Sequence, residues 1–201
     1  MSRLTVGYHG TTRQIADEIV HGSKPFLKSN NEGDWLGYGA YFFEDGRKRA
    51  LTWAKNRYST PLNEPAVVSV NIDLDGCLDL VDSKFCALLR NKYHDFLDLE
   101  RQLGSFDDQA GLIVLGGKVF TTESSDTNPR TRPPIDNYRD RTFINWIVRI
   151  LRKRGVTIRS VRGVFLSGSG IFETSHVFDW GHIQIAVLDD TVLSDPKIVE
   201  I

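Results

Sequence analysis

The chain has 201 residues, a length typical of one globular domain, and is 40% hydrophobic and 25% charged. Its 25 Lys and Arg residues nearly balance 26 Asp and Glu residues, and the net charge of -1 argues against a nucleic-acid binder that relies on overall positive charge. Two cysteines are too few for a disulfide scaffold or a cysteine-rich zinc module.

Short strands and helices are predicted to alternate in the first half of the chain. Apolar residues recur at 3–4 residue spacing in Arg13–His21, and Thr11 or Thr12 can cap this helix. Gly22 suits the end of the helix because glycine is favoured just beyond helix C-termini. The predicted strands are Leu4–Tyr8, Tyr41–Phe43, Ala66–Leu74 and Cys77–Leu80, and a second helix is predicted over Arg47–Ser59.

The second half contains two further predicted helices, Ser83–Leu103 and Asp140–Arg154, and the latter ends in a basic turn followed by glycine. The other predictions are a hairpin of Leu112–Val114 with Lys118–Thr121, a mobile loop over Thr121–Pro134, and strands at Val161–Leu166 and His182–Leu188. This order indicates a single α+β domain over residues 1–201, with a helical or loop insertion at about 82–140.

The start of the chain shows no apolar signal-peptide core, and no window approaches roughly 18 uncharged apolar residues. We therefore expect a cytoplasmic protein with no contact to a membrane. The five histidines show no spacing typical of a metal site, and no metal ligand is predicted.

The first candidate functional segment is Tyr8–Thr12, where His9 and Gly10 stand at the end of a predicted strand. An imidazole and open backbone groups at a strand end can be presented to a ligand. The alternative is an ordinary strand-to-helix turn in which a threonine caps the helix.

The second candidate segment is Trp35–Asp45, with the glycines Gly37 and Gly39 and several aromatic residues. The glycines allow close approach of the backbone, and the aromatic rings offer flat surfaces for stacking. The alternative is a core strand kinked at its glycines.

The third candidate segment is Trp180–Leu188, in which His182 and Gln184 lie on one face of a predicted strand. A buried glutamine needs hydrogen-bond partners, because an unpaired amide costs on the order of 1–3 kcal/mol. The alternative is a half-exposed strand whose polar face meets solvent.

Cations are concentrated in the stretch Arg139–Arg162. This stretch could face phosphate or nucleic acid, RNA or DNA, or it could be a solvated helix face whose cations complement the helix C-terminus.

Taken together, the three segments resemble the ADP-ribosyltransferase superfamily, in its diphtheria-toxin-like and poly-ADP-ribose-polymerase-like branch. That branch carries a His-Tyr-acid triad. His9-Gly10-Thr11 resembles its first motif, the run from Gly37 to Phe42 its second, and Gln184 stands where the acid is expected.

The resemblance implies two small packed antiparallel sheets with flanking helices, which form a cleft for NAD as co-substrate. It implies the catalytic residues His9, Tyr41 and Gln184. The implied NAD-binding residues are His9, which bonds a ribose, Gly10, which holds the nicotinamide amide, Tyr41, which stacks on the nicotinamide ring, and Thr11, Tyr38 and Phe42.

Glutamine can replace the hydrogen bond of the acid but neither its charge nor its basicity. The expected activity is therefore mono-ADP-ribosyl transfer, with NAD glycohydrolysis or a catalytically degenerate nucleotide- or peptide-binding module as alternatives. The acceptor-side base could be Glu173, Asp179 or Asp45. The resemblance also suggests a bacterial or phage-defence toxin with an antitoxin partner, and a nucleic-acid acceptor, for instance RNA, is slightly favoured over a protein.

Overall fold

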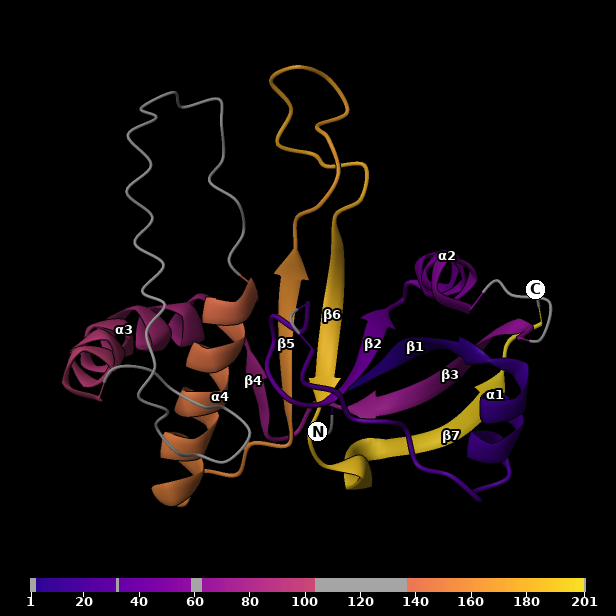
Figure 1. The fold of residues 1–201 in the computed structure, drawn as a ribbon, viewed down its shortest axis with the longest axis horizontal. Helices are drawn as coiled ribbons and strands as arrows, with labels where there is room; N and C mark the ends of the chain where they lie inside the picture. The colour runs from indigo at the N-terminus through magenta and orange to yellow at the C-terminus, as the bar shows by residue number, and fades with distance from the viewer. Residues whose placement is uncertain (1–2, 32, 59–62, 104–136, 201) are drawn as a thin grey trace.

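The computed structural model describes residues 3–31, 33–58, 63–103 and 137–200. The helices are α1 (Arg13–Val20), α2 (Arg47–Tyr58), α3 (Ser83–Leu103) and α4 (Asn137–Lys153), with a short 3-10 turn at Asp190–Val192. The strands are β1 (Leu4–Thr12), β2 (Ala40–Glu44), β3 (Pro65–Asp73), β4 (Cys77–Asp79), β5 (Ser160–Phe165), β6 (His182–Val187) and β7 (Leu193–Ile198). The α+β class predicted from the sequence is confirmed (Figure 1).

The strands form one curled seven-stranded sheet in the order β4-β5-β6-β2-β1-β3-β7. Two separate antiparallel sheets were expected, and this expectation is wrong because β1 and β2 are hydrogen-bonded neighbours and β4 pairs with β5 in parallel. The link between β1 and β2 is short, with the pairs Gly7–Glu44 and Tyr8–Phe43. The two halves of the sheet diverge beyond this link, as Figure 1 shows.

Each half of the sheet has its own hydrophobic core. One core joins α1 to β3 and to the neighbouring faces of β2 and β6, with Ile19, Phe42, Val68 and Ile185 at its centre. The other core packs α4 against β4, β5 and β6. Because the sheet changes its covering helices between the halves, its middle strands carry side chains that no helix fully covers.

The predicted cap and terminal glycine of α1 agree with the structure, whereas α4 begins at Asn137 and not at the predicted Asp140. The backbone N–H of Ile15 donates to the Thr12 hydroxyl at the start of α1, and Gly22 adopts a positive φ of 73° beyond its end. Strand β7 was not predicted, because its sequence Leu-Ser-Asp-Pro-Lys-Ile lacks the apolar alternation of a half-buried strand. The hairpin predicted at 112–121 and the loop predicted at 121–134 lie outside the described residues.

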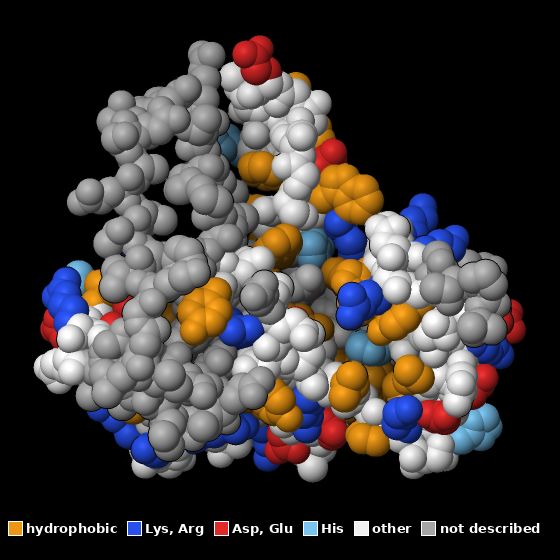
Figure 2. Space-filling model, viewed as in Figure 1, with side chains coloured by type: hydrophobic (Ala, Val, Ile, Leu, Met, Phe, Trp, Pro, Cys, Tyr) orange, Lys and Arg blue, Asp and Glu red, His pale blue; other side chains and the backbone are white. Residues whose placement is uncertain are grey.

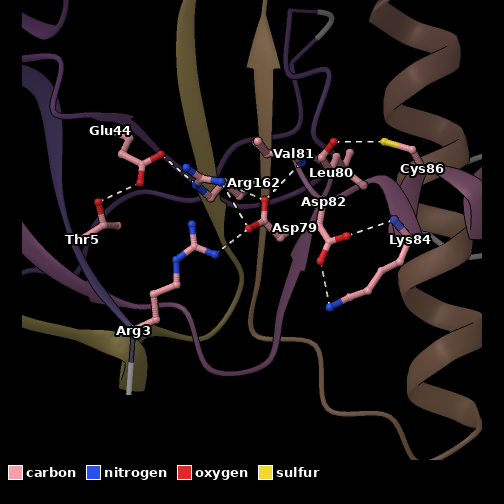
Figure 3. Close-up of polar contacts among 10 residues, drawn as sticks. All are labelled: Arg3, Thr5, Glu44, Asp79, Leu80, Val81, Asp82, Lys84, Cys86 and Arg162. Atoms are coloured by element: carbon pink, nitrogen blue, oxygen red, sulfur yellow. Dashed lines mark hydrogen bonds and ion pairs between the residues drawn. The ribbon is translucent and has the colours of Figure 1, made fainter. Parts of the chain in front are cut away.

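A buried ion-pair cluster ties the two halves of the sheet together (Figure 3). Arg162 of β5 is 6% exposed and donates to Glu44 of β2 at 2.8 Å and to Asp79 of β4 at 2.9 Å. Arg3 also donates to Asp79, and Thr5 of β1 donates to Glu44. Arg162 therefore belongs to the interior, and neither of the two interpretations of the stretch Arg139–Arg162, a nucleic-acid-facing patch or a solvated face, applies at this residue.

Candidate functional site

A cleft of about 700 Å³ opens where β1 leaves β2. The backbone hydrogen bonds between β1 and β2 end at the Tyr8–Phe43 pair. Beyond it, the His9 Nδ1–H donates to the Tyr41 carbonyl at 2.8 Å. Histidine, cationic and apolar side chains gather in this central hollow in Figure 2. The lining residues are His9, Gly10, Leu27, Ser29, Asn31, Gly33, Asp34, Tyr41, Phe43, Trp53, Arg57, Tyr58 and Gln184.

The His9 imidazole has a defined tautomer. A carbonyl can only accept, so the bond to Tyr41 places the proton on Nδ1 and leaves Nε2 as an acceptor. Burial lowers the pKa of His9, which keeps the ring neutral. Phe26 and Phe42 contact the ring from the core. Within the described part of the chain Nε2 makes no hydrogen bond, so it can accept one from a ligand hydroxyl.

Tyr41 supports one wall of the cleft. Its hydroxyl donates to the Gly37 carbonyl at 2.8 Å and accepts from the Leu36 backbone N–H at 3.0 Å. Burial, followed by the negative charge of Asp34, raises the pKa of Tyr41 far above its usual value. The hydroxyl thus holds the turn after Trp35 through two hydrogen bonds, and the ring is the part that we expect a ligand to contact.

Gln184 lies in a directional chain of hydrogen bonds. The Trp35 indole N–H donates to Gln184 Oε1 at 2.7 Å, and the Gln184 amide donates to His182 Nε2 at 2.9 Å. His182 Nδ1–H in turn donates to the Trp180 carbonyl. Each member has the role that its chemistry allows, and a carboxylate at 184 could not donate to Nε2. The amide retains one N–H and one lone pair for a ligand.

Aromatic packing fixes this hydrogen-bonded chain. His182 contacts Phe43 and Phe165, with ring centroids 5.2 and 5.3 Å apart, and Trp35 contacts Phe165. Gly163 faces Gln184 across β5 and β6, and a Cβ on Gly163 would stand only 2.7 Å from the Trp35 ring. Close packing of Trp35 on the strand therefore depends on this glycine.

The α2 helix supplies the opposite side of the cleft with Trp53, Arg57 and Tyr58. Trp53 is 43% exposed, and its ring meets Tyr58 edge-on at 5.8 Å. A Cβ on Gly10 would stand 2.5 Å from the Ala50 carbonyl oxygen, so this glycine allows α2 to approach β1. The cleft thus combines an exposed cation with two aromatic rings.

Asp34 is a carboxylate within the cleft that was not predicted from the sequence. It belongs to the polar connector before Trp35, and its side chain accepts from the Asn31 backbone N–H. No periodic pattern or motif marked this position. The three acids expected near the site, Asp45, Glu173 and Asp179, do not line the cleft among the described residues.

The structure brings His9, Gly10, Tyr41 and Gln184 together around one cleft, although they come from three distant segments. The other expected NAD-binding residues do not line it. Strand alternation turns Phe42, 1% exposed, into the core, and Thr11 is buried. Tyr38 lines a separate groove, because its backbone N–H is held by Asn145 Oδ1 on α4.

Several cations of the basic stretch Arg139–Arg162 also contact other segments of the chain. Arg141 donates to the Asn30 carbonyl, Arg139 to Glu100 on α3, and Arg152 to the Ile158 carbonyl. Arg159 lies 3.8 Å from Asp75. Arg139, Arg141 and Arg152 of α4 are therefore at least partly engaged by other segments of the chain.

Comparisons with known proteins give limited information. No family model matches the chain, and no solved structure matches it. A stretch of 43 residues, 21% of this chain, is 46% identical to an uncharacterized protein of Methanocaldococcus jannaschii. That match spans 19% of the length of the archaeal protein. Among the described helices, none combines the length and apolar character needed to cross a membrane.

Proposed function

We propose that the chain has an ADP-ribosyltransferase-like fold and acts as an NAD-dependent mono-ADP-ribosyltransferase. The observation that carries the proposal is the convergence of His9, Tyr41 and Gln184 on one cleft with hydrogen-bonding capacity to spare. These are the residues through which the sequence resembles that superfamily, and they come from strands β1, β2 and β6.

The chemical character of the cleft suits the parts of a dinucleotide. Arg57 is an exposed cation that can pair with a pyrophosphate, and Trp53 beside it offers an aromatic face for a base. His9 Nε2 can accept from a ribose hydroxyl, and the remaining N–H and lone pair of Gln184 suit a hydroxyl or an amide. The Tyr41 ring can stack on nicotinamide.

The co-substrate supplies an activated glycosidic bond: as the ribose C1′–nitrogen bond breaks, its electron pair leaves with neutral nicotinamide. The acceptor atom then bonds to C1′, and its proton passes to solvent water. The residues of the cleft hold both ends of the dinucleotide and limit access of water. Positive charge develops on the ribose, so an anion in the cleft would favour this step.

Asp34 is the residue we assign to this electrostatic role. Gln184 is neutral, whereas Asp34 brings a carboxylate into the same cleft, where its charge helps to raise the pKa of Tyr41. A carboxylate that faces developing positive charge lowers the barrier most where water is excluded. The cleft would thus take its negative charge from the connector before β2 rather than from β6.

Asp34→Asn is expected to lower the rate of nicotinamide release about 100-fold or more, because one preorganised electrostatic group is removed. Asparagine keeps an oxygen that can accept from the Asn31 N–H, so the fold should be retained. Release is measured by chromatography of nicotinamide. Asp45→Asn, which changes a carboxylate outside the cleft, is the matched control. Equal rates for the wild type and Asp34→Asn would exclude the assignment.

The transfer itself is tested with NAD labelled in its adenylate part and with RNA, DNA and protein offered as separate acceptors. Label in one macromolecular fraction, together with release of nicotinamide, supports the transferase. Free ADP-ribose as the sole product would identify an NAD glycohydrolase instead. Intact NAD in every mixture would contradict both activities and favour a binding module.

A further inference from the structure

A second groove, of about 790 Å³, lies beside the cleft on the other side of the connector before β2. Asn30 of that connector lines this groove, whereas its neighbours Ser29 and Asn31 line the cleft. The remaining lining residues are Tyr38, Asn145, Val148, Arg149, Arg152, Lys153 and Leu188. The two hollows are therefore separated by the thickness of one chain segment.

The groove carries positive charge without a counter-charge in its lining. Arg149, Arg152 and Lys153 are cationic, and none of the lining residues just named is acidic. Among the described residues, neither Arg149 nor Lys153 forms an ion pair, whereas Arg152 is partly engaged by the Ile158 carbonyl. Arg149 and Lys153 are four residues apart and share one face of α4, so both can contact the same anionic chain.

The groove also presents an aromatic ring. Tyr38 is 47% exposed, and its backbone is anchored to α4 by the bond from its N–H to Asn145 Oδ1 at 2.8 Å. The backbone at Tyr38 is therefore held against α4, and the phenol remains largely exposed in the groove. Exposed aromatic rings next to a row of cations are typical of sites that stack the bases of single-stranded nucleic acids and hold their phosphates.

We propose that this groove binds single-stranded nucleic acid, with a base stacked on Tyr38 and phosphates held by Arg149 and Lys153. The proposal rests on the proposed function in one respect: a strand seated here would continue past the connector toward the cleft and serve as the ADP-ribose acceptor. A duplex is disfavoured, because the bases of a paired strand are stacked on one another and cannot lie on the phenol ring.

The experiment measures binding of a fluorescein-labelled single-stranded RNA by anisotropy with the full chain and without NAD, and repeats it with single-stranded DNA. Tyr38→Ala is expected to weaken binding about tenfold, and Tyr38→Phe to keep near-wild-type affinity, because stacking is worth about 1–3 kcal/mol per base. The double variant Arg149→Glu, Lys153→Glu should lower the slope of log affinity against log salt by about 1.4, since each lost phosphate contact counts roughly 0.7 for single strands. Lys24→Glu, a charge reversal beside α1, should leave affinity and slope unchanged.

Equal affinity in the wild type, Tyr38→Ala and the double variant would overturn the proposal. It would also be overturned if an acidic peptide displaced the RNA and depended on the same residues, since the groove would then be a protein site. Its failure is separable from failure of the NAD chemistry. Asp34→Asn should bind RNA with wild-type affinity while its nicotinamide release is reduced. The double variant should release nicotinamide from NAD at the wild-type rate when water is the acceptor.

Discussion

Arg162→Met is expected to destabilise the protein by about 3–5 kcal/mol, the loss typical when one partner of a buried ion pair is removed. Arg162 is 6% exposed, and its guanidinium is hydrogen-bonded to Glu44 and Asp79. Methionine fills similar space but leaves the Glu44 carboxylate buried without a cation. Unfolding in guanidinium chloride, with the midpoint and slope compared between variants, measures the change in free energy.

Arg154→Met is the matched control, because Arg154 follows α4 as an exposed cation. Its effect should stay within about 0.5 kcal/mol. Adding Glu44→Gln to Arg162→Met should recover part of the lost stability, since a neutral amide is less costly to bury than an unpaired carboxylate. A loss below about 1 kcal/mol for Arg162→Met would show that the cluster in Figure 3 does not tie the halves of the sheet together.

Gln184→Glu is expected to raise the pKa of His182, which is lowered in the wild type. In the wild type, burial lowers the pKa of His182, and the Arg49 cation lowers it further. A carboxylate at 184 would lie where the amide nitrogen now stands 2.9 Å from His182 Nε2. Because an adjacent opposite charge favours the imidazolium, the pKa of His182 should rise by about 1–3 pH units. Histidine NMR shifts recorded against pH measure this directly.

The same substitution changes how stability depends on pH. A lowered histidine pKa favours the neutral ring in the folded state, so wild-type stability falls as pH drops below the unfolded value of about 6.5. In Gln184→Glu the raised pKa adds stability below about 6.5, which is lost as pH rises through the folded pKa. Each pH unit of difference is worth about 1.4 kcal/mol.

Gln184→Met separates charge from the loss of hydrogen bonds. It should keep the low pKa of His182 while removing the bonds to Trp35 and His182. If His182 titrates alike in the wild type and Gln184→Glu, the directional chain through Gln184 is not as described.

Local elements were predictable because their signals are local. Helix α1 is marked in the sequence by its cap Thr12 and its terminal Gly22. The Val and Ile residues of β3 predict a strand. The proposed site segments were found for the same reason: His9 and Gln184 interrupt apolar strands, and unusual residues in a regular pattern are visible without a structure.

Long-range features were not predictable. The pairs Gly7–Glu44 and Tyr8–Phe43 join two half-sheets into one, and no residue pattern predicts so short a link. Asp34 reaches the cleft only because its connector folds beside β2, and nothing in its own sequence marks it. Arg162 looked like part of a basic surface, since its acid partners lie more than 80 residues away in sequence at Asp79 and more than 110 away at Glu44.

The most direct test of NAD binding at this cleft is a calorimetric titration of the full chain with NAD. One site with a dissociation constant between about 1 μM and 1 mM is expected, which is the usual range of KM and applies to binding where chemistry is slower than substrate release. Arg57→Glu should weaken binding at least about tenfold through the lost pairing with phosphate, whereas Lys24→Glu should not change it. Absence of binding by the wild type at millimolar NAD, or equal affinity in Arg57→Glu, would contradict the proposed site.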